Sequence, residues 1–170
     1  MAGASTSGLQ TLTDTFPWSS LPENSTILDL GGSQGHVSAF LAAQHTHLKF
    51  IVQDLPAVME TRTFQIPEDV KGRVKMMEYD FFEPQDLEKL QDVDVVLMRY
   101  IFHNWSDEYC VRILRNLKGV LRKGARIVVQ DHLLPEPGSL GLLKENVIRY
   151  VDSESLRTQT VLILMVDRWT

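Results

Sequence analysis

The N-terminal third of the chain carries the run Thr26-Ile-Leu-Asp-Leu-Gly-Gly-Ser-Gln-Gly35. Its apolar start predicts a buried strand over 26–30, and the residues that follow predict a helix over 36–44. The glycines between these two elements let a ligand approach the backbone closely. The run therefore predicts a strand, a turn and a helix with room for a ligand, and the alternative is a tight turn without one.

Four more apolar segments follow this unit. They predict strands over 48–52, 73–77, 93–98 and 125–129, with helices opening at Pro56 and, capped by Ser106, running to about Leu121. Single helices between strands require parallel pairing, and uninterrupted apolar strands indicate burial on both faces. We therefore predict an α/β fold with a doubly wound, mostly parallel sheet. Ligands of such folds bind at the carboxyl ends of the strands.

The 170 residues are enough for one domain. Residues 1–25 are rich in Ser and Thr, and we expect a partly disordered lead-in with Phe16 and Trp18 as docking anchors. The ligand-binding domain is expected over 26–152. Residues 153–170 form a tail in which Val161–Val166 predicts an edge strand, and an uncovered apolar edge strand favours aggregation.

Composition excludes several classes of protein. The net charge is −5, so a nucleic-acid-binding surface is not expected. A single cysteine, Cys110, rules out an internal disulfide and fits a reducing compartment, so we expect a cytoplasmic protein. The apolar run 161–166 is far shorter than the roughly 20 residues that cross a bilayer, and residues 1–8 lack the features of a signal peptide.

The glycine-rich turn allows three functional interpretations. A dinucleotide fingerprint needs glycines at its first, third and sixth places, where this chain has Gly31, Ser33 and His36. A hydrolase nucleophile elbow does match at 31–35 around Ser33, but no oxyanion loop precedes it. The third interpretation, a turn that binds adenosylmethionine, fits Asp29 at the strand end with glycines beyond it.

The second strand supports this third interpretation. It ends in Asp54, about 20 residues beyond the glycines, where the two oxygens of a carboxylate can accept both ribose hydroxyls. Taken alone, Asp54 is also a candidate cap for the helix that Pro56 opens. The turn and the acid together favour a ligand that contains a nucleoside.

The later strand ends carry further polar and aromatic residues. Asp80 and Phe81 follow the third strand, where an acid can accept the adenine amino group and a ring can cover the base. His103 follows the fourth strand and Asp131 ends the fifth. A carboxylate beside His103 would hold its imidazole in one tautomer and stabilise the charged form. A polar turn, a structural histidine and a loop cap are the alternatives. His45 and His47 are interpreted as solvated surface, with no metal site.

These segments together resemble one family: the catalytic domain of adenosylmethionine-dependent O-methyltransferases of the caffeic-acid type, including fungal enzymes of secondary metabolism. The resemblance covers residues 26 to about 152 in the family's order. Its most specific part is the His-Asn-Trp-Ser-Asp-Glu run that ends at Glu108. The other matching segments are Leu28–Gly35, Phe50–Pro56, Asp80–Phe82 and Asp131–Pro135.

The resemblance implies roles for these residues. It implies a Rossmann-like fold, S-adenosyl-L-methionine as cofactor, no metal, and a small, phenolic acceptor. His103 corresponds to the general base, and Asp131 to an acid that flanks it and is commonly Glu. The implied cofactor contacts are Gly31 and Gly32 in the turn, Asp54 at the ribose, Asp80 and Phe81 at the adenine, and Arg99.

The chain departs from this family at both ends. Members carry an N-terminal helical domain that builds a homodimer, and we expect that domain to be absent, because only 25 residues precede the first strand. Leu142 to Asp152 resembles the helix that lines the acceptor site. The usual closing hairpin is expected to be lacking, and Glu154 does not match the family's second acid. We predict methyl transfer to a hydroxyl; the alternative is a catalytically silent module that binds cofactor or a partner.

Overall fold

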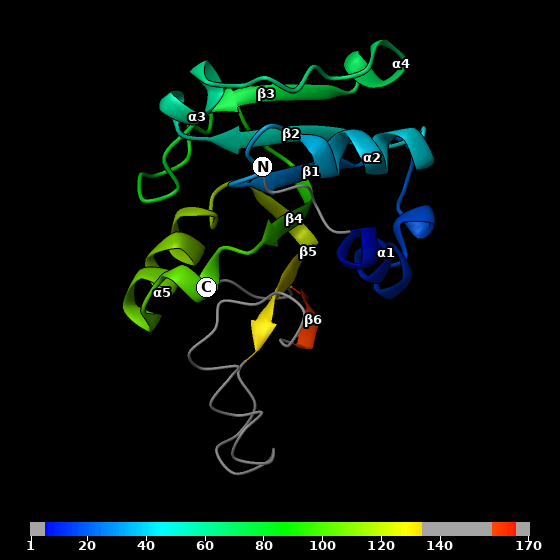
Figure 1. Ribbon diagram of the computed structural model, residues 1–170. Coiled ribbons are helices and arrows are strands. Elements are labelled where there is room, and N and C mark those ends of the chain that lie inside the picture. The colour runs from blue at the N-terminus through cyan, green and yellow to red at the C-terminus, as the bar shows by residue number, and fades with distance from the viewer. Residues whose placement is uncertain (1–5, 134–157, 166–170) are drawn as a thin grey trace.

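The computed structural model describes residues 6–133 and 158–165 and contains one six-stranded sheet (Figure 1). The strand order is β3-β2-β1-β4-β5-β6. Strands β1 to β5 pair in parallel, and β6 runs antiparallel to β5. The strands are β1 (Thr26–Leu30), β2 (Lys49–Asp54), β3 (Val74–Glu78), β4 (Val93–Arg99), β5 (Leu121–Leu133) and β6 (Thr158–Met165). The predicted doubly wound, mostly parallel α/β fold is confirmed.

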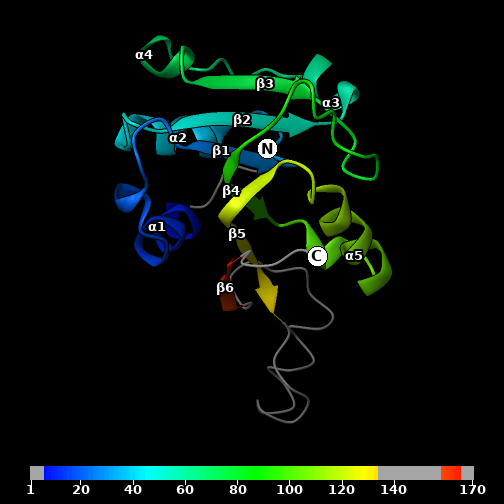
Figure 2. The same cartoon turned by 180° about the vertical axis from the view of Figure 1, so that it is seen from behind.

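Helices cover both faces of this sheet (Figures 1 and 2). They are α1 (Thr6–Thr15), α2 (His36–Gln44), α3 (Pro56–Glu60), α4 (Glu68–Lys71) and α5 (Asp107–Asn116), with short 3-10 turns η1 (Trp18–Ser20) and η2 (Phe102–Asn104). Alternate strand residues point to opposite faces. Ile27 therefore packs with the helices α1 and α2, whereas its neighbour Leu28 packs with α5.

The position of β1 determines where a ligand can bind. Strand β1 lies between β2 and β4, so the chain leaves it first toward β3 and later toward β5. Where the connections from two neighbouring parallel strands run toward opposite edges of the sheet, a crevice forms outside the carboxyl ends of those strands. The glycine-rich turn follows β1 at this point, Asp54 ends β2, and Arg99 ends β4.

The N-terminal segment differs from the predicted lead-in. Helix α1 occupies Thr6–Thr15, and the side chains of Leu12, Phe16 and Trp18 are almost fully buried against the sheet. The Trp18 Nε1 donates a hydrogen bond of 3.2 Å to the Leu12 carbonyl. Leu9, Leu12 and Phe16 have helical spacing, which the Ser- and Thr-rich composition obscured. Phe16 and Trp18 are thus part of the domain's own core.

The predicted end of the helix after Ser106 is wrong, and so is the predicted start of the fifth strand. The helix at Pro56 ends at Glu60, and α5 ends at Asn116 rather than near Leu121. After Asn116 the backbone makes tight turns, with Leu117 and Lys118 each bonded three residues back. Strand β5 then begins at Leu121, which pairs with Val93, and not at Ala125. Pairing with a neighbouring strand overrode the helical pattern there.

Strand β6 (Thr158–Met165) lies at the sheet edge and overlaps the predicted strand Val161–Val166. The side chains of Leu162, Ile163 and Leu164 are exposed. Residues Val166, Leu142–Asp152 and Glu154 are outside the described residues. None of the helices described is long and apolar enough to cross a membrane.

Candidate functional site

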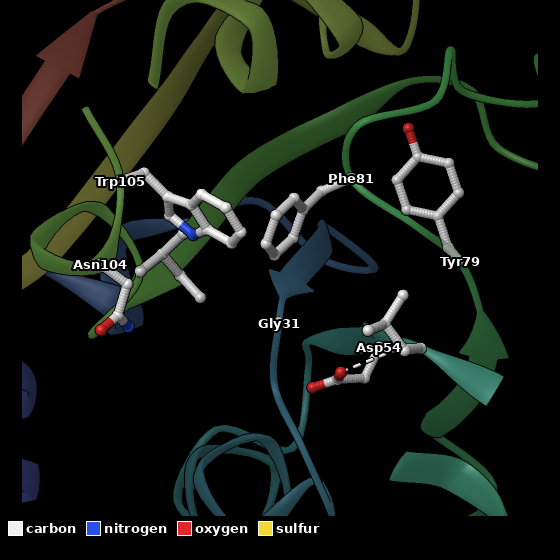
Figure 3. A pocket seen from close by; sticks show the side chains of 8 residues that line it. Gly31, Asp54, Tyr79, Phe81, Asn104 and Trp105 are labelled. Atoms are coloured by element: carbon white, nitrogen blue, oxygen red, sulfur yellow. Dashed lines mark hydrogen bonds between the residues drawn. The ribbon is translucent and has the colours of Figure 1, made fainter. Parts of the chain in front are cut away.

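A cavity of about 280 Å³ opens at the carboxyl ends of the strands around the glycine-rich turn. Figure 3 shows the Asp54 carboxylate on one side of this space and the rings of Phe81 and Trp105 on the other. The cavity therefore offers an acceptor of hydrogen bonds opposite flat apolar surfaces. The lining residues are Gly31, Asp54, Leu55, Tyr79, Phe81, Ile101, Asn104 and Trp105.

The glycine-rich turn forms the floor beside Asp54. The N–H groups of Gly31 and Gly32 both donate to the Gln53 carbonyl, at 2.8 and 3.1 Å. Gly31 has φ +71°, and a Cβ there would lie 2.5 Å from Ile101 Cδ1. A Cβ on Gly32 would lie 2.6 Å from the Asp29 carboxyl carbon. Both positions therefore require glycine, one for its backbone conformation and space, the other for space alone.

The Asp54 carboxylate joins the turn to the end of β2. Its Oδ2 accepts the Ser33 N–H and its Oδ1 accepts the Leu55 N–H, both at 2.8 Å. The N-cap of α3 is Leu55, so Asp54 is not the cap residue of that helix. A carboxylate oxygen has two acceptor sites, so each oxygen can accept one more hydrogen bond. Asp54 can thus bind a diol without giving up its backbone contacts.

Asp29 lies beneath the turn and is 2% exposed. The Ser38 hydroxyl donates to its Oδ2 at 2.7 Å. Burial raises the pKa of Asp29 to about 6, although the Ser38 hydrogen bond and the charge of Arg99 act in the opposite direction. Asp29 supports the turn from below and does not line the cavity.

The segment after β3 supplies the aromatic wall. Phe81 lines the cavity, whereas Asp80 does not: its Oδ1 accepts the Phe82 N–H at 2.9 Å and closes a local turn. Edge contacts join Phe81, Phe82, Trp105 and Tyr109, with the Phe82 and Trp105 centroids 4.6 Å apart. Sequence reasoning did not assign Trp105, Asn104 or Tyr79 to the cavity. The available signal was the place of Tyr79 directly after β3 and of Asn104 and Trp105 in the connection between β4 and α5.

His103 and Asp131 form a pair beside the cavity. The His103 Nδ1 lies 2.8 Å from Asp131 Oδ1, and the His103 backbone N–H donates to Oδ2 at 3.2 Å. The histidine side chain is 29% exposed and the aspartate side chain 10%. Neither residue lines the cavity, but Asn104 and Trp105, which follow His103 directly, do. With Nδ1 directed at the carboxylate, Nε2 is the ring atom that would accept a proton.

Arg99 does not line the cavity. Its Nε donates to the Gln130 Oε1 at 2.8 Å, and its guanidinium lies 4.2 Å from the Tyr100 ring centroid. The buried Gln130 in turn donates to the Gly8 carbonyl at 2.7 Å. Arg99 therefore ties β4 to β5, and through Gln130 to α1.

The hydrolase interpretation finds little support. Ser33 has φ +53°, yet across residues 6–133 and 158–165 no hydrogen bond joins its hydroxyl to a histidine. In the same part of the chain, no group of three or more His, Cys, Asp or Glu side chains is arranged to hold a metal ion. His45 and His47 are half-buried, with both Nε2 atoms buried and unpaired among the described residues, so their assignment to solvated surface is wrong.

Comparison with known proteins identifies the family. A family profile described as the O-methyltransferase domain matches residues 6–157. A Cladonia grayi protein, named grayanic acid biosynthesis cluster O-methyltransferase, is 45% identical over 139 residues, which cover 81% of this chain and 30% of that protein. The chain belongs to the O-methyltransferase domain family, whose cofactor is S-adenosylmethionine.

Two solved structures have the same fold. The calicheamicin biosynthesis methyltransferase CalO1, in its SAH-bound form, aligns with a TM-score of 0.62 and 28% identity over 82% of this chain and 41% of that one. A structure titled "A Pericyclic Reaction enzyme" aligns with a TM-score of 0.57 and 26% identity, over 78% and 32%. The chain spans less than half the length of the first curated relatives it matches, from 17% to 42%.

Proposed function

We propose that this chain transfers a methyl group from S-adenosylmethionine to a hydroxyl of a small phenolic molecule, with His103 as general base. The observation that supports this most directly is the hydrogen-bonded pair of His103 and Asp131 beside the cavity. The proposal also includes a cytoplasmic location, which the single cysteine supports. A homodimer of the whole protein is proposed from the family resemblance alone.

The cavity residues fit this cofactor. Asp54 would accept the ribose hydroxyls, and the absence of a side chain at Gly31 leaves room for the nucleoside against the turn. Phe81 and Trp105 would cover the adenine ring. When bound, adenosylmethionine supplies a methyl group already activated by the positive charge on its sulfur.

His103 would accept the proton of the acceptor hydroxyl. A phenol resembles the tyrosine side chain, has a pKa near 10, and is therefore largely neutral at pH 7. Removal of its proton by a nearby base typically accelerates such reactions by about 10²–10⁴-fold. Asp131 would hold the ring in the tautomer that leaves Nε2 as the acceptor. The remaining acceleration would come from holding the two reactants in line.

A second candidate function is a silent module that binds the cofactor or a partner without methyl transfer. The similarity to the structure named "A Pericyclic Reaction enzyme" supports this candidate, because a protein with this fold need not transfer a methyl group. A module that binds the cofactor would use the same cavity as the enzyme and would differ from it in the use of His103. A test must therefore measure cofactor binding and turnover separately.

The experiment is a calorimetric titration of the chain with S-adenosylhomocysteine, followed by methylation of a panel of phenols. The proposal expects micromolar binding that Asp54→Ala abolishes, and turnover that His103→Ala abolishes at unchanged cofactor affinity. Binding without turnover on any phenol would favour the silent module. A folded, monodisperse chain that binds no cofactor would overturn methyl transfer and would favour a module that binds a partner.

A further inference from the structure

Side chains of α5 hold the segment that forms the aromatic wall of the cavity. The Asn116 Nδ2 donates to the Phe81 carbonyl at 3.0 Å. The Arg112 Nε and one of its terminal amino groups donate to the next carbonyl, that of Phe82, at 3.1 and 2.8 Å. Two consecutive carbonyls of the wall thus accept hydrogen bonds from two side chains of one helix.

The spacing of the donors explains why both reach the segment. Arg112 and Asn116 are four residues apart on α5, so they lie one above the other on the same face of the helix. Ile113 and Leu117 are buried in the core between α5 and the sheet. The helix is therefore fixed to the domain by its apolar side, and Arg112 and Asn116 bind the segment after β3 to this fixed helix.

The Arg112 side chain adds a second contact at the same place. Its guanidinium carbon lies 5.4 Å from the centroid of the Phe82 ring, in the range of a cation–π interaction. Phe82 in turn contacts Trp105, another wall residue, edge to face. The carbonyl and the ring of one residue are thus held by one arginine.

The same segment is held on its other side by β2. The amides of Gln53 and Gln85 exchange two hydrogen bonds of 3.0 and 2.9 Å, and both side chains are buried. The Gln53 carbonyl also receives the N–H groups of the glycine-rich turn. The wall is therefore held between the strand that carries Asp54 and the helix that follows His103.

We propose that Arg112 and Asn116 are positioning residues for the cofactor: they hold the Phe81 ring at the distance from Asp54 that a nucleoside requires. This inference rests on the proposed function, since it concerns the same cavity. Neither residue lines the cavity, so each acts through Phe81. Removal of either donor lets the segment move away from the ligand and leaves one loop carbonyl without its partner.

The expected effects follow from the type of bond lost. Asn116→Ala removes one neutral hydrogen bond and should weaken binding of S-adenosylhomocysteine about fivefold, whereas Arg112→Met removes a charged donor and should weaken it about tenfold or more. Arg112→Lys retains the charge with a single donor group and should fall between wild type and Arg112→Met. Arg115→Met is the matched control, because Arg115 is an exposed arginine of the same helix and, among the described residues, its side chain donates no hydrogen bond to the Phe81 or Phe82 carbonyl.

The decisive measurement is a double-mutant cycle by calorimetry with S-adenosylhomocysteine. Asn116 acts on the backbone carbonyl of Phe81, so its effect should largely disappear when Phe81→Ala has already removed the ring. A general loosening of the fold would instead give additive losses in the cycle. Melting temperatures of all variants are recorded beside the affinities, and the Arg112→Lys variant serves if Asn116→Ala does not fold.

The outcomes separate the two proposals. If the wild-type chain binds S-adenosylhomocysteine and both Asn116→Ala and Arg112→Met bind it with the same affinity, the positioning role is overturned and the proposed function stays intact. Additive losses in the cycle would also overturn it. A folded wild-type chain that binds no S-adenosylhomocysteine would overturn the proposed function, and the positioning role with it.

Discussion

The carboxylate of Asp131 contacts two N–H groups of His103, the ring Nδ1 at 2.8 Å and the backbone N–H at 3.2 Å. One acid therefore orients both the imidazole and the short turn η2 that carries it. The contact follows from the sheet, because β4 and β5 are parallel neighbours and their carboxyl ends meet at one edge. The pairing of these two strands is thus what assembles the proposed base.

Replacing Asp131 by Asn tests the orienting role. The two N–H groups of His103 contact different oxygens of Asp131, and asparagine replaces one of these oxygens by an NH₂ group, which places a donor against an N–H group. We expect turnover to fall by about 10–10³-fold, which is no more than the fall expected for His103→Ala. The affinity for S-adenosylhomocysteine should stay within about a factor of two. Steady-state kinetics and calorimetry on the same preparation check this. Unchanged turnover would contradict the role of Asp131.

Replacing Asp54 by Asn tests the ribose site. The variant retains one acceptor for the Ser33 or Leu55 N–H but loses the charge that strengthens bonds to a diol. Loss of one charge-assisted bond, worth about 1.5–3 kcal/mol, predicts a fall in cofactor affinity of about 10–150-fold. Calorimetric titration measures it, with the exposed Asp69→Asn on α4 as control. Equal affinities in the two variants would argue against a diol at Asp54.

The raised pKa of Asp29 predicts a pH-dependent stability. The folded chain holds this proton up to a pKa of about 6, whereas the unfolded chain releases it near 3.8. Between these values the folded state binds more protons, so the free energy of unfolding falls as pH rises, by about 3 kcal/mol in total. The charge on Asp29 above pH 6 therefore destabilises the ligand-free fold.

Asp29→Asn removes this titration and still accepts the Ser38 hydroxyl. Denaturant unfolding at several pH values should show a flatter profile between pH 4 and 6 and a more stable variant at pH 7. The exposed Asp92→Asn provides the control and should reproduce the wild-type profile. A variant less stable than wild type at pH 7 would show that the carboxylate holds the turn in its charged form.

A methyl group at Gly31 should damage both stability and binding. The φ of +71° is unfavourable for alanine by about 1–2 kcal/mol, and the new Cβ would press on the Ile101 side chain. Gly72→Ala is the matched control, since its φ is −68° and no heavy atom lies within 4 Å of the new Cβ. Thermal unfolding should show a lower melting temperature for Gly31→Ala and an unchanged or slightly higher one for Gly72→Ala.

The strands and their carboxyl-end residues could be predicted because each is local. Apolar runs of five or six residues marked the strands, and the glycines and Asp54 marked the turn and the end of β2. Placing Asp131 beside His103 required only the order of neighbouring parallel strands. The sequence pattern was sufficient for the five parallel strands, but not for α1, whose apolar spacing the Ser- and Thr-rich composition obscured.

Other features depended on contacts distant in the chain. Arg99 has the sequence position of a cavity residue, but Gln130 draws its side chain toward β5. Asp80 bonds the backbone two residues on, so it closes a turn rather than facing the cavity. The contacts of Asn116 and Arg112 to the wall cross some 30 residues, and no local pattern signals them. Side-chain direction, unlike strand position, required the structure.

The central position of β1 also has a consequence for biosynthesis. The bond between Ser33 and Asp54 closes 21 residues, that between Thr26 and Asp94 closes 68, and that between Gln130 and Gly8 closes 122. Closure of a longer loop costs more entropy, and a chain emerges from the ribosome N-terminus first. The half of the sheet around Asp54 can therefore assemble while the second half is still being translated. Helix α1, although made before every strand of the sheet, completes its contacts with the sheet last.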